Sequence, residues 1–329
     1  MTRVLVVAAH GARIRVHRRS LVVESNGERM VAPLHEVDRV VVATSGVSVT
    51  SSAIRLLARS GVGIVFLDAH GEPIVSLEPP WINAAAETRL AQYRASVERP
   101  LNLARAMVAA KLENQAGFLR SLARRTSAAW LREEAAAVEE RMLRVYSAGS
   151  AEEIRGLEAQ AARRYWGSLA RLLPQSLGFQ GRDHGSRDPV NTVLNYLYGV
   201  LYAEVFQALV VHGLDPYVGF LHALRPGSPA LVYDYAEMFR VSAVDSLVYT
   251  MLASRDAPGI RVDPETGLLA RETRAELVKR MYEWLRRRAV DSRGQAEPLE
   301  RHIRLYARRL AQSLRAGTDY QGFVEAWRP

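Results

Sequence analysis

The sequence predicts an α+β protein in which a β-rich domain, residues 1–79, precedes a larger α-helical domain, residues 80–329. In the first 80 residues, short runs rich in Val and Ile are separated by Gly, Ser or Asn-Gly, which is typical of strands and turns. From Ala84 almost to the end, hydrophobic residues recur at helical spacing. Between the two parts lies Glu78-Pro-Pro-Trp81, whose prolines stop the preceding strand and stiffen a short linker.

The β-rich part has clear turn and cap signals. Asn26-Gly27 predicts a hairpin, because both residues tolerate the positive φ of a tight turn. Thr50 or Ser51 can cap a short helix over residues 52–60. The four histidines of this part fit no metal-ligand spacing, so we expect no reaction chemistry here. We expect strands at Val4–Ala8, Arg13–His17, Leu21–Glu24, Met30–Pro33, Val37–Val42 and Val62–Leu67.

The second part is predicted to be almost entirely helical. Pro100 suits the first turn of a helix. Asp188-Pro189 predicts a helix N-cap followed by a proline in the first turn. The apolar stretch 193–211 contains Asn, Glu and Gln, so we expect a buried helix and no membrane span. We expect helices at 84–98, 100–124, 127–147, 150–172, 188–212, 230–240, 241–253, 271–289 and 297–316, with a small hairpin at 260–269.

Composition limits the classes of function. The chain has no cysteine, which excludes disulfides, thiolate nucleophiles and zinc–thiolate sites and suits a reducing compartment. The N-terminus lacks the order of a signal peptide, so we expect a cytoplasmic protein. The net charge is +9, and only Lys111 and Lys279 of the 44 basic residues are lysines. An arginine surplus favours nucleic acid, although a GC-rich genome would give the same composition.

The stretch Val218–Arg240 carries the strongest chemical signal. His222 stands alone in an apolar segment, and Asp234 and Glu237 would share one face of a following helix. Separately, they could be a core histidine, a helix-capping acid and a salt bridge to Arg240. Together, one imidazole and two carboxylates form a ligand set for Mg²⁺ or Mn²⁺. A hard cation in an arginine-rich protein suits phosphodiester chemistry.

Two further helices are weaker candidates. Glu158 lies in GLEAQAARRYW, where small residues share its face and Arg163, Arg164 and Arg171 make the helix basic. Its simpler interpretation is an exposed surface charge. On the helix 188–212, Asn191, Asn195 and Tyr198 lie on one face, which is either a satisfied polar seam between helices or part of a functional site.

Several segments, in order, resemble one known family. They are SGVSVTSSAIRLLARSGVGIVFLDAHG, GLEAQAARRYW, RDPVNTVLNYLYGVLYAEV and GFLH followed by LVYDYAEMFR. The chain resembles, over nearly its whole length, the CRISPR-associated endonuclease/integrase family that inserts new spacers, the first of the Cas series. Two positions depart from the family pattern: Ala159 stands where glycine is common, and Tyr235 where leucine is common.

The resemblance implies a function and a site. Glu158, His222 and Glu237 would be the metal ligands, with Asp234 a supporting acid, and all four would be catalytic. The fold would be a β-sandwich-like N-terminal domain that dimerises, followed by an α-helical catalytic domain. The substrate would be double-stranded DNA with 3′ ends, joined as a protospacer to a CRISPR repeat in antiviral defence. A small ferredoxin-fold protein, the second of the Cas series, would be a partner.

We therefore expect a metal-dependent DNA endonuclease and integrase. Two alternatives stay open: a basic nucleic-acid-binding scaffold without catalysis, which would be indifferent to EDTA, and a ligand-gated helical regulator, which would bind one sequence specifically. Lys111→Ala is expected to be near-neutral, as a control position. The candidate phosphate contacts are Arg163, Arg164, Arg182, Arg187 and Arg225.

Overall fold

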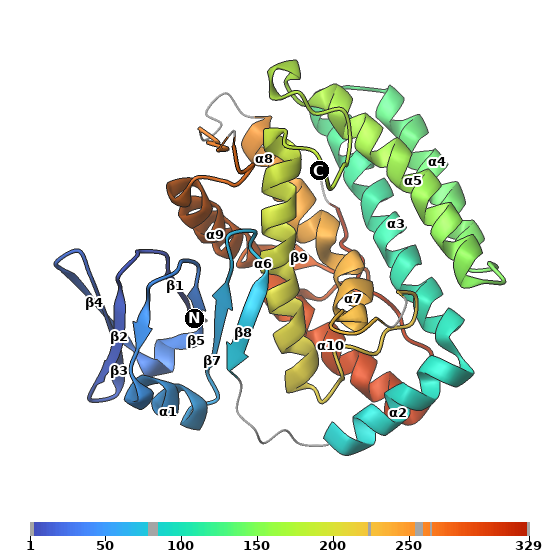
Figure 1. The fold of residues 1–329 in the computed structure, drawn as a ribbon. Helices are drawn as coiled ribbons and strands as arrows, with labels where there is room; N and C mark the ends of the chain where they lie inside the picture. Colours follow the sequence, from blue (N-terminus) through green and yellow to red (C-terminus); the bar gives the residue numbers. More distant parts are fainter. Residues whose placement is uncertain (1–2, 78–84, 223–224, 254–258, 264, 328–329) are drawn as a thin grey trace.

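The computed structural model describes residues 3–77, 85–222, 225–253, 259–263 and 265–327. Strands occupy the N-terminal part and helices dominate the rest (Figure 1), which confirms the predicted α+β class. The predicted linker Glu78–Trp81 lies outside the described residues.

The N-terminal part contains two four-stranded sheets. In sheet A, β1, β5 and β7 are parallel, and β8 is antiparallel to β7. In sheet B, β2, β3 and β4 form an antiparallel meander, and β6 pairs in parallel with β2. The strands are β1 (Arg3–Val7), β2 (Arg13–His17), β3 (Ser20–Ser25), β4 (Glu28–Pro33), β5 (Val37–Val42), β6 (Ser48–Val49), β7 (Gly63–Leu67) and β8 (Pro73–Leu77).

Local signals placed the turns and the first helix correctly. Asn26 and Gly27 both have positive φ, 51° and 80°, in the β3–β4 hairpin. Thr50 caps α1 (Ser51–Arg59) by accepting a hydrogen bond from the backbone N–H of Ala53 at 3.3 Å. A 3₁₀ turn, η1 (Leu34–Glu36), precedes β5.

The parallel strands of sheet A are buried on both faces. Because strand side chains alternate, Leu5 and Val40 point toward sheet B and pack with Leu21, whereas Val4 and Val41 join the core of the helical part. The sheets therefore pack as a sandwich, as expected, and the outer face of sheet A carries the helices.

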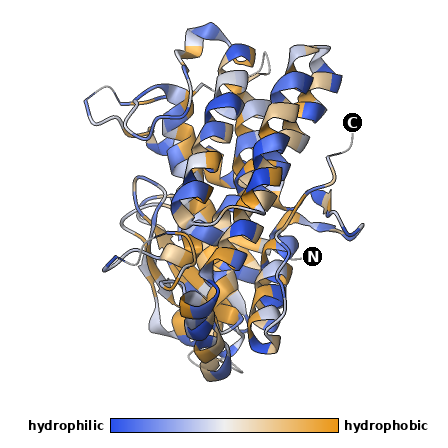
Figure 2. Cartoon of the chain, turned by 90° about the vertical axis from the view of Figure 1, so that its right-hand side faces the viewer, coloured by the Kyte–Doolittle hydropathy of each residue, from blue (hydrophilic) through white to orange (hydrophobic). Residues whose placement is uncertain are grey.

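The helical part is assembled around long buried helices. Its helices are α2 (Ala85–Glu98), α3 (Pro100–Thr126), α4 (Trp130–Val145), α5 (Ala151–Leu172), η2 (Gln175–Leu177), α6 (Pro189–Val211), α7 (Ala230–Arg240), η3 (Val241–Asp245), α8 (Ser246–Leu252), α9 (Arg271–Leu285) and α10 (Leu299–Ala316). In Figure 1, α3, α4 and α5 lie side by side, and α6 lies between β8 and α7. Hydrophobic residues gather on the inward faces (Figure 2).

Two predicted elements near the C-terminal half need correction. The helix expected over 271–289 ends at Leu285, and β9 (Arg288–Val290) pairs with β10 (Ala296–Pro298). Residues 241–245 of the helix expected over 241–253 form a π-helix, η3. The hairpin expected at 260–269 is present as a bridge between Val262 and Leu269, with Pro264 outside the described residues.

Helix α6 connects the two parts of the protein. It is long and apolar enough to cross a membrane, but 78% of its most apolar stretch is buried inside the protein, as predicted for a core helix. Gly71, with φ +86°, and Gly199 let the turn after β7 contact α6 backbone to backbone. A Cβ on Gly199 would lie 2.5 Å from the Gly71 carbonyl oxygen.

Candidate active site

Asp234 organises the loop that precedes α7. Its buried carboxylate accepts hydrogen bonds from the backbone N–H groups of Phe220, Leu221 and His222, at 2.5, 2.9 and 3.0 Å. It also contacts Nδ1 of His222 at 2.5 Å. Gly219 allows this approach, since a Cβ there would lie 2.6 Å from Oδ2 of Asp234. Asp234 therefore positions the His222 ring.

Among the described residues, the imidazole of His222 makes its polar contact through one nitrogen, Nδ1. With Nδ1 against Asp234, Nε2 is the nitrogen that can bind a ligand. The side chain is 43% exposed, so a ligand can reach it. The hydrogen bond to Asp234 raises the pKa of His222, burial opposes this, and the charges of Glu237 and Glu158 raise the pKa further.

Glu158 and Glu237 meet at a lysine. Nζ of Lys111, on α3, lies 2.5 Å from Oε1 of Glu158 on α5 and 2.6 Å from Oε2 of Glu237 on α7. The side chains are 10%, 16% and 5% exposed, respectively. Burial lowers the pKa of Lys111, but the two carboxylates raise it by more, so the net shift is upward. The centre of this site thus attracts a cation.

Arg240 binds the other oxygen of Glu237 from the next turn of α7. Its guanidinium also donates to the Tyr202 hydroxyl and lies over the Tyr198 ring at 4.9 Å. Burial alone would raise the pKa of Glu237, but Arg240 and Lys111 lower it overall. The salt bridge considered as the simpler interpretation of Glu237 therefore exists, alongside the lysine contact.

The π-helix η3 places a further carboxylate behind the site. Asp245 accepts hydrogen bonds from the hydroxyls of Tyr198 at 2.5 Å and Tyr165 at 3.0 Å. Burial raises the pKa of Asp245 despite these two bonds. Such π-bulges occur often at functional sites.

Arg182 satisfies the polar face predicted on α6. It donates to Oδ1 of Asn191 at 2.9 Å and to Oδ1 of Asn195 at 2.6 Å, and it lies 5.4 Å from the Tyr198 ring centroid. This face is therefore a satisfied polar seam. Because Arg182 and Tyr198 also line a cavity beside Lys111, the seam forms one wall next to the carboxylates.

That cavity has a volume of about 600 Å³ and a basic lining. Lys111, Arg163, Arg182 and Arg240 contribute to it, together with the Trp166 ring. Such a lining suits a phosphate backbone.

The other candidate arginines are placed differently. Arg164 pairs with Glu134 of α4 at 3.1 Å and lines, with Arg163, a second depression between α4 and α5. Arg187 and Arg225 are exposed and line neither hollow in the described part of the chain.

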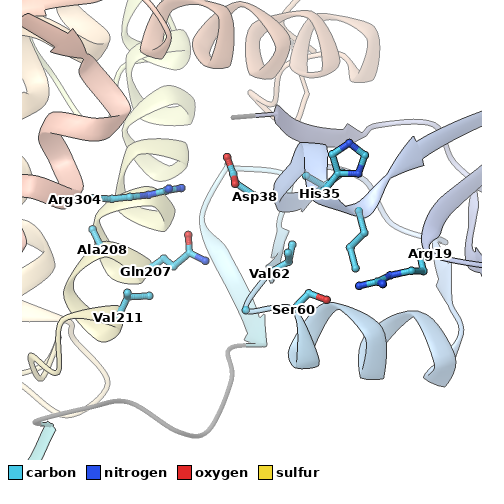
Figure 3. A pocket seen from close by; sticks show the side chains of 12 residues that line it. Arg19, His35, Asp38, Ser60, Val62, Gln207, Ala208, Val211 and Arg304 are labelled. Atoms are coloured by element: carbon cyan, nitrogen blue, oxygen red, sulfur yellow. The ribbon is translucent and has the colours of Figure 1, made fainter. Parts of the chain in front are cut away.

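A separate cavity of about 650 Å³ lies between sheet A and helices α6 and α10. Figure 3 shows Asp38 of β5 facing Gln207 of α6 and Arg304 of α10 across it, with Arg19 and His35 on the β side. It contains none of the predicted site residues.

The predicted ligands are partly assembled. Within the described ranges, no three His, Asp or Glu side chains are close enough together to form a metal site. Glu158 and Glu237 share the Lys111 ammonium, and their charges act on His222. Two carboxylates and an imidazole suit a hard or borderline divalent cation, and the lysine marks where positive charge is favoured. The chemistry of these donors therefore suits such an ion, but in this arrangement the described residues do not form a metal site.

Sequence reasoning missed Lys111 and Asp245. The expectation that Lys111 is a neutral control position loses its basis, because its side chain is buried between two carboxylates. One signal was available: Lys111 is a charged residue inside an apolar helical segment of a chain that otherwise uses arginine. Asp245 had no comparable signal.

Comparison with known proteins gives a consistent result. Residues 5–283 match the family described as CRISPR associated protein Cas1. The chain is 37% identical to the CRISPR-associated endonuclease Cas1 of Hyperthermus butylicus, over 98% of this chain and 99% of that relative. It superposes on a casposase bound to integration product with a TM-score of 0.83 and 25% identity, over 99% of this chain and 94% of that one. It shares the fold of a chain in a Cas6-RT-Cas1–Cas2 complex, with a TM-score of 0.77 and 19% identity, over 97% of this chain and 36% of that one.

Proposed function

This chain belongs to the Cas1 family of CRISPR-associated endonucleases, and we propose that its Glu158, His222 and Glu237 hold the divalent cation of the reaction. As a member of that family, the protein is a nuclease and integrase of CRISPR adaptation, which inserts DNA fragments as new spacers. The observation that supports the site is the Lys111 ammonium between Glu158 and Glu237, because it marks a buried position that favours positive charge.

The ion would be Mg²⁺ or Mn²⁺. Carboxylate oxygens suit both, and the imidazole of His222 favours Mn²⁺. When bound, it would stabilise charge on the phosphate oxygens and activate an oxygen nucleophile, either water or a DNA 3′-hydroxyl. The protein's own residues fix the geometry: Asp234 holds the ring of His222, and Arg240 holds the second oxygen of Glu237.

The proposed substrate is double-stranded DNA, the protospacer and the CRISPR repeat. Arg163 and Arg182 line the cavity beside the carboxylates, where a phosphate backbone would bind. Arg164, Arg187 and Arg225 would add outer contacts. Because such contacts release counterions, affinity for DNA should fall steeply with salt.

The proposed assembly is a homodimer, formed through the β-rich domain, together with a small ferredoxin-fold Cas2 protein in the cytoplasm. One matched structure is itself a complex with Cas2. Met30 and Val31 on edge strand β4 are 41% and 50% exposed, and Ile74 on edge strand β8 is 64% exposed. Exposed apolar edges are typical of surfaces that pair with another chain. Light scattering on the purified protein should give twice the chain mass.

The site is tested by three substitutions. Glu158→Ala, His222→Ala and Glu237→Ala should each abolish Mn²⁺-dependent nicking of branched DNA, and EDTA should abolish it in the unaltered protein. Glu152→Ala, an exposed position on the same helix as Glu158, is the matched control and should retain activity. Activity that survives all three site substitutions would contradict the ligand assignment, and indifference to EDTA would favour the non-catalytic scaffold.

A further inference from the structure

We propose that Lys111 is the resident counter-cation of the Glu158–Glu237 pair, and that a divalent cation binds there only by displacing the lysine ammonium into the neighbouring cavity. This inference rests on the proposed function, since it takes these two carboxylates as metal ligands. It assigns Lys111 a positioning role that couples the metal to the nucleic acid.

Geometry makes the two cations exclusive. Nζ of Lys111 lies 2.5 and 2.6 Å from the two carboxylate oxygens, so it occupies the space between them. A magnesium or manganese ion bound by both oxygens would lie roughly 2.0–2.2 Å from each. The ion and the nitrogen would then be within contact distance in a buried site, which their like charges forbid.

Charge explains why a lysine is needed when no metal is bound. Glu158 and Glu237 carry two negative charges, and of these two carboxylates Arg240 pairs with Glu237 in the described structure. Without Lys111, two buried carboxylates would face each other with one cation for both, and uncompensated buried charge is strongly destabilising. With the lysine, the group of four side chains is neutral.

The adjacent cavity gives the ammonium a place to move. Lys111 itself lines this cavity of about 600 Å³, as do Arg163 and Arg182. Because those side chains are also positive, the displaced ammonium is favoured there only when an anion such as a phosphodiester is present. Metal and DNA should therefore strengthen each other's binding, as thermodynamic linkage requires.

The chain offers an internal control for this displacement. It has two lysines, Lys111 buried on α3 and Lys279 exposed on α9. In reductive methylation read by peptide mass spectrometry, Lys279 should react at the same rate with and without Mn²⁺. Lys111 should be protected without metal and should react at least about tenfold faster when Mn²⁺ and a short duplex with a 3′ overhang are added.

The outcomes distinguish the displacement of Lys111 from the assignment of Glu158, His222 and Glu237 as metal ligands. If calorimetry shows Mn²⁺ bound to the protein but Lys111 stays protected, this inference is wrong and the ligand assignment stands. If the protein binds no Mn²⁺ with or without DNA, the ligand assignment fails and this inference fails with it.

A pair of variants tests the energetics. Lys111→Met keeps the length of the side chain without its charge, so it should bind Mn²⁺ at least about tenfold more tightly and melt at a lower temperature without metal. It should also lose the gain in Mn²⁺ affinity that DNA gives the unaltered protein. Lys111→Arg keeps the charge and should retain weak metal binding. A purely structural lysine would lower the melting temperature of Lys111→Met with no gain in Mn²⁺ affinity. If Lys111→Met fails to fold, the methylation experiment still tests the displacement of Lys111, because it uses the unaltered protein.

Discussion

At the scale of single residues, Asp234 shows how one buried carboxylate can organise a loop and orient a neighbouring histidine. It is 2% exposed and accepts hydrogen bonds from three successive backbone N–H groups as well as contacting the His222 ring. Both its oxygens are used inside the protein. The orientation of the His222 ring is therefore fixed by a residue on the following helix.

Asp234→Asn tests this role. An amide keeps the size but turns one acceptor into a donor facing backbone N–H groups, so the free energy of unfolding should fall by about 2–4 kcal/mol. Nicking activity should fall as well, because His222 loses its orientation. Urea denaturation measures the first effect. Asp319→Asn, an exposed acid, is the control and should change stability little. A loss no larger than the control's would show that the loop is held in another way.

The sequence drew attention to the acids and the histidine but not to the residues that contact them. His222, Asp234 and Glu237 were indicated by unusual residue types in an apolar segment, a property visible along the chain. Lys111 lies on a helix far away in sequence, and its approach to Glu158 and Glu237 depends on the packing of α3 against α5 and α7. Contacts between residues so far apart in the sequence produce no regular spacing along the chain, so sequence analysis could not find them.

At the scale of elements, the π-helix η3 determines where Asp245 lies. A regular α-helix would rotate the residues after Arg240 differently, whereas η3 brings Asp245 under the hydroxyls of Tyr165 and Tyr198. These two hydroxyls tie α5 and α6 to the end of α7. The wide turn therefore serves to join three helices around one buried carboxylate.

Tyr198→Phe should lower the free energy of unfolding by about 1–3 kcal/mol, because it leaves an oxygen of Asp245 without its donor. Chemical denaturation provides the measurement. Tyr217→Phe, at a tyrosine that is 50% exposed, removes the same hydroxyl from the surface and should have almost no effect. Equal losses in the two variants would argue against a structural role for the Asp245 bonds.

The first turn of α10 gives a pH-dependent prediction. Burial raises the pKa of Glu300 from 4.5 to about 7, and the charge of Glu204 adds to the shift. A carboxyl whose folded-state pKa is raised contributes stability that is fully present below pH 4.5 and is lost as pH rises through about 7.

Glu300→Gln removes this penalty. The variant should therefore melt at a higher temperature than the unaltered protein at pH 8 and show no such gain near pH 4.5, as followed by calorimetry. Glu272→Gln, an exposed acid in the first turn of α9, should show no pH-dependent difference of this kind. A gain for Glu300→Gln that is the same at both pH values would rule out titration of Glu300 as its cause.

Helix starts were predictable because their causes are local. Asp188 followed by Pro189 gave the start of α6 within one residue, and the Asp188 side chain does accept from the Asn191 N–H. The end of α9 was not predictable, because β9 begins where Arg287 pairs with Glu325, a contact across 38 residues. The arginine-rich run at residues 286–288 does not by itself indicate that Glu325 is the partner of Arg287.

At the scale of the whole molecule, a buried ion pair ties the strands to the helices. Arg39 of β5, 1% exposed, pairs with Glu204 of α6, which also accepts a hydrogen bond from Tyr282 of α9 at 2.7 Å. The sequence predicted the order of the two parts. It could not predict this pair, because the two residues are 165 positions apart.

Arg39→Met should lower the free energy of unfolding by about 3–5 kcal/mol, because it leaves Glu204 buried without its cation. The double variant Arg39→Met with Glu204→Leu should recover much of that loss, since two apolar side chains replace the pair. Arg55→Met, at an exposed arginine of α1, is the control. If the double variant is as unstable as the single one, the pair serves packing more than charge.

The glycine contact between the two parts has a consequence for how they fit together. Gly71 and Gly199 meet with no side chain between them, and a Cβ on Gly71 would lie 2.3 Å from the carbonyl oxygen of Tyr196. On the same stretch of this helix, the side chains of Asn195 and Tyr198 contact Arg182 and Asp245, respectively. Because the two backbones touch at this joint, a side chain added at either glycine would push the turn after β7 away from α6 and shift the strands against the helical part.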